Sequence, residues 1–162
     1  MLGACDELWQ LWTSPSGGEY RVSNHGVVQR KAKNVWKPTG LSATAGGYFH
    51  IGGCKQGKRW NEYVHRLVAK LFIPNTNSLR EVDHKDRDKS NNHVSNLRWA
   101  SRKQNAENKM GLGYYLVKKT GKWAAQIKTN GKSEHLGTFD SEKDARACYV
   151  AAKKARHPFC SG

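Results

Sequence analysis

The pattern of hydrophobic and polar positions changes twice along the chain. Residues 7–57 carry short β-type runs at 19–23, 26–30 and 48–51, separated by turns rich in Gly, Ser, Pro and Asn. Residues 60–72 predict a helix, because apolar residues recur three and four positions apart and Pro74 follows. Those apolar residues are Val64, Leu67, Val68 and Leu71. A small antiparallel sheet is therefore expected first, followed by a helical element.

The middle of the chain alternates strands with a polar stretch. Residues 81–84 and 96–100 have strand character, and residues 85–92 between them are too rich in Asp, Lys and Asn to be buried. A further helix is expected to start at Ser101, because Ser101 and Gln104 have the spacing of a capping box. The predicted order is helix, strand, polar loop, strand, helix.

The last third of the chain predicts three strands and one helix. The strands are expected at 114–117, 123–128 and 133–139, and the pair Asn130–Gly131 is a strong hairpin signal. A helix capped by Ser141 follows, with an apolar face made of Ala145, Cys148, Tyr149 and Ala152. The whole chain is thus predicted to be α+β, in three domains at 1–57, 58–111 and 112–162.

The net charge of the chain indicates which class of molecule it binds. The 162 residues include 28 Lys and Arg against 13 Asp and Glu, a net charge of +15, and each of the three segments is basic. So large an excess favours a polyanionic partner, above all nucleic acid. No apolar run is long enough to cross a membrane, and residues 1–10 lack the basic start of a signal peptide. We expect a cytoplasmic protein that is neither secreted nor membrane-bound.

The four cysteines do not predict a metal site. They lie far apart in the sequence and form no closely spaced pair of the kind that zinc sites use. Buried free thiols are the expected state. The residues concerned are Cys5, Cys54, Cys148 and Cys160.

A candidate for chemistry lies at the end of the 81–84 strand. The carboxylate of Asp83 is the kind of hard oxygen ligand that Mg²⁺ prefers, and the neutral imidazole of His84 suits proton abstraction near pH 7. On its own such a pair is more often an ordinary surface pair. Asp86 and Asp88, balanced by neighbouring basic residues, are expected to form a solvated charge run rather than a second metal site.

The longer string around this pair is more specific. After Asp83 and His84 come an Asp-rich loop, the pair Asn91–Asn92, the run Asn-Leu-Arg-Trp at 96–99, and Gln104–Asn105. This pattern closely resembles the HNH endonucleases, the ββα-metal (His-Me finger) nucleases. The preceding run Val-His-Arg-Leu-Val-Ala at 64–69 is typical of their phage and intron-encoded homing branch.

The resemblance implies a role for each matching residue. His84 would be the general base, Asp83 and Asn105 would hold one divalent ion, Mg²⁺ or Mn²⁺, and Asn96 would brace the loop. Arg87 stands where many relatives have Gly, which leaves the turn of this loop open. His65, on the predicted helix, is expected to pack or to contact phosphate rather than to bind metal.

The flanking segments resemble DNA-binding modules. Trp9, Trp12 and the run Tyr-Arg-Val-Ser-Asn-His-Gly at 20–26 resemble the NUMOD4 module that precedes HNH cores. Residues 121–128, 136–140 and 144–147 resemble the AP2 domain, which lays its sheet in the major groove. The first strand lacks the Arg-rich character of that family, and His135 stands where Trp is common. Six side chains are expected to face DNA: Lys118, Lys119, Lys122, Gln126, Lys128 and Lys132.

These features together predict a metal-dependent, site-directed endonuclease that hydrolyses phosphodiester bonds in double-stranded DNA and acts as a monomer. The main alternative is an AP2-type DNA-binding regulator that carries an inactive nuclease core. A second alternative is an RNA-binding protein, because basic sheets also bind RNA.

Overall fold

The chain folds as two units, Met1–Arg102 and Lys103–Gly162. The structure, a computed structural model, describes residues 6–109, 111–129, 131–157 and 159. Both units combine short antiparallel strands with helices, so the mixed α and β composition is confirmed. No helix among these residues is long and apolar enough to cross a membrane. The division into three domains at residues 57 and 111 stays a prediction.

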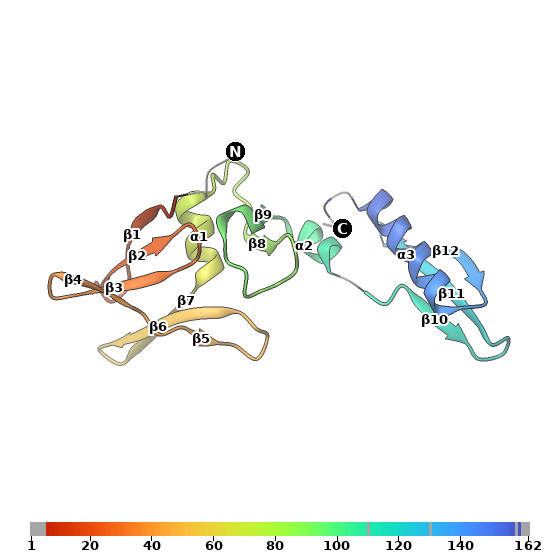
Figure 1. Cartoon of the computed structure of the whole chain (residues 1–162), viewed down its shortest axis with the longest axis horizontal. Coiled ribbons are helices and arrows are strands. Elements are labelled where there is room, and N and C mark those ends of the chain that lie inside the picture. The colour runs from red at the N-terminus through yellow and green to blue at the C-terminus, as the bar shows by residue number, and fades with distance from the viewer. Residues whose placement is uncertain (1–5, 110, 130, 158, 160–162) are drawn as a thin grey trace. The chain divides into compact units, whose positions relative to one another are not determined.

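The first unit contains more strands than the sequence predicts. One antiparallel sheet has the order β1-β2-β3-β4, and a second has the order β5-β6-β7 (Figure 1). The strands of the first sheet are β1 (Trp9–Thr13), β2 (Glu19–Ser23), β3 (Val28–Ala32) and β4 (Val35–Pro38). Those of the second are β5 (Ser42–Ala43), β6 (Phe49–Lys55) and β7 (Lys58–Tyr63).

The helix predicted from residue 60 begins later, and this is a correction. Helix α1 spans Val64–Phe72, and residues 58–63 pair with β6 instead. The reason is the turn at Gln56 and Gly57, both with positive φ (50° and 76°), which joins β6 to β7 as a tight hairpin. Hairpin pairing satisfies the backbone groups of residues 58–63, so the helix starts only at Val64.

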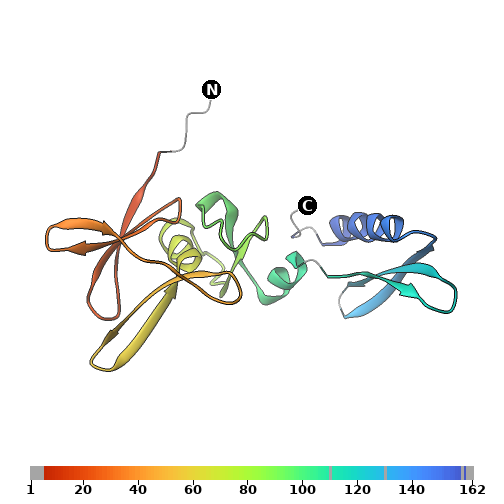
Figure 2. The ribbon, with the colours of Figure 1, turned by 60° about the horizontal axis from the view of Figure 1, so that its bottom comes forward.

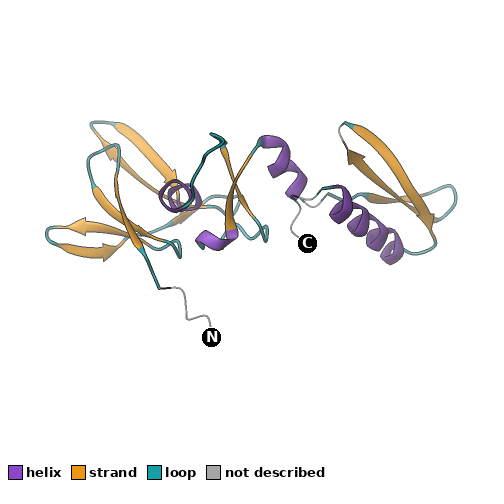
Figure 3. Ribbon diagram, turned by 90° about the horizontal axis from the view of Figure 1, so that it is seen from above, coloured by secondary structure: helices purple, strands orange, loops and turns teal. Residues whose placement is uncertain are grey.

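Helix α1 is the centre of the core of the first unit. Figure 3 shows it end-on, with the N-terminal strands on one side and the β8–β9 hairpin on the other. Its Val64, Leu67 and Val68 are fully buried. They share one hydrophobic cluster with residues from both sides, among them Tyr20, Val22, Ile51, Val82 and Leu97. The N-terminal strands and the following elements therefore fold around the same helix.

The predicted order around the polar loop is confirmed. Strand β8 (Glu81–His84) is followed by the loop, the short 3₁₀ helix η1 (Val94–Asn96) and strand β9 (Leu97–Ala100). Strands β8 and β9 pair as an isolated antiparallel hairpin. Helix α2 (Arg102–Asn108) begins directly after Ser101, as its capping spacing predicts.

The second unit contains the predicted three strands and one helix. The sheet has the order β10-β11-β12, and α3 lies along one of its faces (Figure 2). The side chain of Ser141 accepts a hydrogen bond from the Asp144 N–H at 3.1 Å, which confirms the predicted cap. The elements are β10 (Tyr114–Val117), β11 (Lys122–Thr129), β12 (Lys132–Phe139) and α3 (Glu142–Arg156). Asn130, from the predicted hairpin pair, lies outside the described residues.

Helix α3 packs closely against the chain at Gly113. A Cβ placed on Gly113 would lie 2.0 Å from ring atoms of Tyr149, so only glycine allows α3 to pack this closely on the chain leading into β10.

Cys54 is exposed on the β6–β7 hairpin and Cys148 is half-buried, and both are free thiols. The expected burial is wrong for Cys54, because the far end of this hairpin is solvent-exposed. Cys5 and Cys160 lie outside the described residues.

Candidate functional site

The end of β8 places two of the predicted site residues in the interior of the first unit. Asp83 is 6% exposed and His84 is 4% exposed. In the antiparallel register Asp83 lies opposite Arg98, and His84 lies opposite Leu97. A solvated surface pair, the ordinary reading of such a dipeptide, does not fit this burial.

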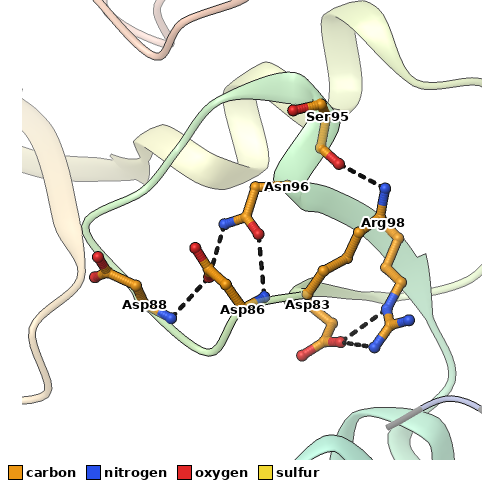
Figure 4. Close-up of polar contacts among 7 residues, drawn as sticks. Asp83, Asp86, Asp88, Ser95, Asn96 and Arg98 are labelled. Atoms are coloured by element: carbon orange, nitrogen blue, oxygen red, sulfur yellow. Dashed lines mark hydrogen bonds and ion pairs between the residues drawn. The ribbon is translucent and has the colours of Figure 1, made fainter. Parts of the chain in front are cut away.

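Asp83 is held by a charged partner that sequence reasoning missed. The Nε and Nη2 atoms of Arg98 both donate to Oδ2 of Asp83, at 2.9 and 2.8 Å (Figure 4). Both side chains are shielded from solvent, with Arg98 21% exposed. The guanidinium therefore orients the carboxylate and offsets the cost of burying its charge. The contact between Arg98 and Asp83 would follow from the pairing register of the two strands. That register cannot be read from two short strands when the loop between them does not identify a turn type.

The ring of His84 is enclosed by polar and aromatic neighbours. Its Nε2 lies 3.2 Å from Oδ1 of Asn92, which is itself buried. The rings of His65 and Tyr48 lie beside it, with centroids 5.1 and 5.9 Å away. Tyr63 packs in turn against His65 at 5.5 Å. The imidazole is thus held by a hydrogen bond with Asn92 and is packed against the rings of Tyr48 and His65.

His65 is a buried histidine on α1. Burial, with smaller effects of His84 and Arg66, lowers the pKa of His65 from 6.5 to about 3. Among the described residues its Nδ1 has no hydrogen-bond partner, so a proton there would be poorly stabilised. His65 is therefore neutral at pH 7, and of its two expected roles, packing and phosphate contact, its burial favours packing.

Asn96 holds the polar loop in shape. Its Nδ2 donates to Oδ1 of Asp86 at 2.9 Å, while its Oδ1 accepts from the Asp86 N–H at 3.1 Å (Figure 4). The same Nδ2 also donates to the carbonyl of Asn91 at 2.8 Å. Partial burial alone would raise the pKa of Asp86, but hydrogen bonds from Asn91 and Asn96 outweigh it and hold this pKa below its usual range. The two loop aspartates are therefore engaged within the loop: Asp86 also accepts from the N–H of Asp88 at 2.8 Å.

Arg87, which stands where many relatives have glycine, takes a backbone conformation that favours glycine. It adopts φ = +70°, the left-handed region that glycine occupies without strain. A non-glycine residue there costs about 1–2 kcal/mol. The loop therefore keeps the turn expected of a glycine, although the residue is arginine.

The remaining predicted residues lie in the second unit. Asn105 is half-buried on α2, and its pairing with Asp83 stays a prediction. The six residues expected to face DNA are all exposed, on β11, β12 and the turn after β10. Lys122 has an acidic neighbour, Asp140, at 3.0 Å, and such an exposed pair contributes little to stability.

The donor atoms fit a hard divalent cation. The predicted ligands, the carboxylate of Asp83 and the amide of Asn105, would offer the oxygen atoms that Mg²⁺ and Mn²⁺ prefer, and such ions commonly retain waters for their other positions. Among the described residues no cluster of three or more His, Cys, Asp or Glu is present.

The comparisons with known proteins agree with this site. A family model described as HNH endonuclease matches residues 62–107, which include Asp83, His84, Asn96 and Asn105. A solved structure of the homing endonuclease I-HmuI, described as "DNA binding and cleavage by the HNH homing endonuclease I-HmuI", is 34% identical with a TM-score of 0.53. The match covers 86% of this chain and 82% of that one. The chain belongs to the HNH endonuclease family.

Curated HNH relatives come from phages, a prophage and a giant virus. DNA endonuclease I-HmuI of Bacillus phage SP01 is 41% identical over 102 residues, or 63% of this chain. A putative HNH homing endonuclease from the SPbeta prophage of Bacillus subtilis is 40% identical over 57% of the chain, and an uncharacterised HNH endonuclease of Acanthamoeba polyphaga mimivirus is 32% identical over 78%. The chain spans 58%, 53% and 36% of the lengths of these three relatives, in that order.

Proposed function

We propose that the chain is a metal-dependent, site-directed endonuclease that hydrolyses phosphodiester bonds in double-stranded DNA. The observation that carries this proposal is the buried Asp83–His84 pair at the end of β8, inside the segment that matches the HNH endonucleases. The carboxylate is held by Arg98 and the imidazole by Asn92. Two adjacent groups held in this way suit a reaction that needs both a negatively charged ligand and a general base.

His84 is the proposed general base. With Oδ1 of Asn92 as the acceptor, Nε2 of His84 carries the ring proton, and Nδ1 presents the lone pair. That lone pair takes a proton from the attacking water, and the ring keeps its direction because Asn92 holds the opposite nitrogen. Proton transfer of this kind contributes about 10²- to 10⁴-fold in rate.

Asp83 and Asn105 are the proposed holders of one divalent ion, Mg²⁺ or Mn²⁺. When bound, such an ion stabilises negative charge that develops on the phosphate and the leaving oxygen. Arg98 keeps the Asp83 carboxylate in one orientation, and Asn96 maintains the loop that follows it. Neither Arg98 nor Asn96 is proposed to touch the reacting atoms.

DNA binding is assigned to the flanking parts of the chain. The β10–β12 sheet packs against α3, and strand alternation places the exposed Lys122, Gln126 and Lys128 on one face of β11, away from the buried Ala125 and Ile127. Lys118 and Lys119 lie in the turn after β10, and Lys132 lies at the start of β12. A basic, polar sheet surface is suited to phosphates and base edges. We infer that this AP2-like domain, 112–162, grips duplex DNA, that a NUMOD4-like module, 1–57, adds contacts, and that the protein acts as a monomer with its nuclease core at 58–111.

The proposed function is tested with the purified full chain and supercoiled plasmid. Cleavage to nicked or linear DNA is expected in Mg²⁺ or Mn²⁺, and none in EDTA. End-mapping of a cleaved DNA library would then give the target and the number of strands cut. Binding of duplex DNA without cleavage in any divalent ion would overturn the nuclease proposal and leave the DNA-binding regulator.

Binding and cutting are expected to separate in the variant Lys128→Ala. Loss of one phosphate contact should weaken DNA affinity several-fold and lower the salt dependence of binding by about one charge, with little change in cleavage rate at saturating DNA. The measurement is a gel-shift titration at several salt concentrations beside a single-turnover rate. Lys143→Ala is the matched control, because Lys143 is exposed on α3, which covers the other face of the sheet. An equal loss of affinity and saturating rate would contradict the division of labour.

A further inference from the structure

The turn between β5 and β6 reaches the loop that follows β8, although some forty residues separate them in sequence. Figures 1 and 2 show the two segments side by side. Nζ of Lys89, in the polar loop, donates to the carbonyl of Gly46 at 2.7 Å and lies 4.8 Å from the centre of the Tyr48 ring. The turn is therefore attached to the loop by a charge-assisted hydrogen bond and a cation–π contact.

The turn itself is tightly built. The Thr44 N–H donates to the carbonyl of Tyr48 at 2.9 Å, and Oγ1 of Thr44 accepts from the Tyr48 N–H at 3.1 Å. Gly47 adopts φ = +83°, a conformation that glycine takes without strain. Tyr48 thus leaves the turn from a backbone with little freedom, and its ring direction is set by the fold rather than by solvent.

The ring of Tyr48 contacts both histidines of the interior. Its centroid lies 5.9 Å from that of His84 and 5.1 Å from that of His65, whose own ring is 5.1 Å from His84. The three rings form a closed triangle, and Asn92 holds the His84 nitrogen. Without Tyr48, one side of the His84 imidazole would lose its packing partner, and rotation of the ring would be restrained less.

We propose that Tyr48 is a positioning residue for His84, so that a turn of the N-terminal segment completes the nuclease site. This inference rests on the proposed function for its catalytic meaning. Tyr48 acts through the imidazole and is not proposed to touch DNA or metal. Burial, followed by the charge of Asp83, raises the pKa of Tyr48, which agrees with a phenol that remains protonated beside this site.

The activity test compares Tyr48→Ala with Tyr48→Phe in the full chain. Alanine removes the ring and is expected to lower the single-turnover rate at saturating DNA by about 10- to 100-fold, because a small misplacement of a reacting group has effects of this size. DNA affinity should change by less than about three-fold. Phenylalanine keeps the ring and should restore most of the rate. A rate within two-fold of wild type for Tyr48→Ala, or a parallel loss of rate and affinity, would overturn the inference.

A second readout does not depend on cleavage. The Cε1–H signal of His84 in the NMR spectrum, assigned with His84→Ala, is expected to shift and broaden in Tyr48→Ala and to stay near its wild-type position in Tyr48→Phe. The signal of His135, in the second unit, serves as the internal reference. An unchanged His84 signal in Tyr48→Ala would show that the ring does not hold the imidazole, and would overturn the inference.

The two readouts separate the inference from the proposed function. If the wild-type chain does not cleave DNA but the His84 signal depends on the Tyr48 ring, the nuclease proposal fails and the positioning role stands. If the wild-type chain cleaves DNA but neither the cleavage rate nor the His84 signal changes in Tyr48→Ala, the nuclease proposal stands and the positioning role of Tyr48 fails. Should Tyr48→Ala fail to fold by circular dichroism, Tyr48→Leu, which keeps apolar bulk without an aromatic ring, takes its place in both measurements with the same expected direction.

Discussion

Replacing His84 with alanine is expected to lower the cleavage rate at saturating DNA by about 10²- to 10⁴-fold, the usual contribution of a general base. Duplex DNA affinity should be nearly unchanged, because the residues proposed to bind DNA lie on the β10–β12 sheet. The measurement is a single-turnover rate in Mg²⁺ beside a gel-shift titration at the same salt concentration.

Folding must be separated from chemistry in this experiment. His84 is buried, so the thermal midpoint of the variant is measured first, and rates are compared well below it. A cleavage rate for His84→Ala close to that of wild type would contradict the assignment of the base. If the wild-type chain itself binds DNA but never cuts it, the alternative of a DNA-binding regulator with an inactive core becomes the better description.

The stability of the first unit is expected to fall as the pH drops below about 6.5. His65 has a pKa of about 3 in the folded chain and an ordinary value of 6.5, so between these values the unfolded chain binds the proton and the folded chain does not. Stability therefore rises with pH across this window and is lost as pH falls. The expected loss relative to pH 8 is about 2 kcal/mol at pH 5 and about 4 kcal/mol at pH 3.

The variant His65→Phe keeps a ring and removes the titration. Urea unfolding at pH 8, 7, 6 and 5 should give a free energy of unfolding that falls steeply with acid for wild type and more shallowly for the variant. The loop carboxylates Asp86 and Asp88, whose pKa values are both lowered, affect stability only in more acidic solution. Parallel pH curves for wild type and His65→Phe would contradict the assignment of this effect to His65.

Local signals in the sequence were sufficient for the elements that depend on neighbours. The capping spacing from Ser101 and the cap at Ser141 marked the starts of α2 and α3, and turn residues separated β10, β11 and β12. The start of α1 was wrong by several residues because the Gln56–Gly57 turn was not recognised as a hairpin. Strands β1, β4, β5 and β7 each pair with the strand next to them in sequence, but few of their side chains are buried, so their own residues carry only a weak strand signal.

The candidate site shows the same limit. Asp83, His84 and Asn96 could be singled out because they lie in one short string with a recognisable spacing. Arg98 was visible in that string, but its contact with Asp83 follows from the register of two paired strands. The approach of Tyr48 to His84 depends on the path of the chain between β5 and β8, and no local pattern encodes that distance.

The shared core around α1 limits how such nucleases can exchange parts in evolution. Recombination at residue 57 would separate Tyr20, Val22 and Ile51 from the helix that they bury, and would remove Tyr48 from His84. A crossover near the start of the second unit breaks no part of this cluster, but it would exchange Asn105, which is proposed to share a metal ion with Asp83. The N-terminal strands are therefore expected to be inherited together with α1 and His84, against which they pack.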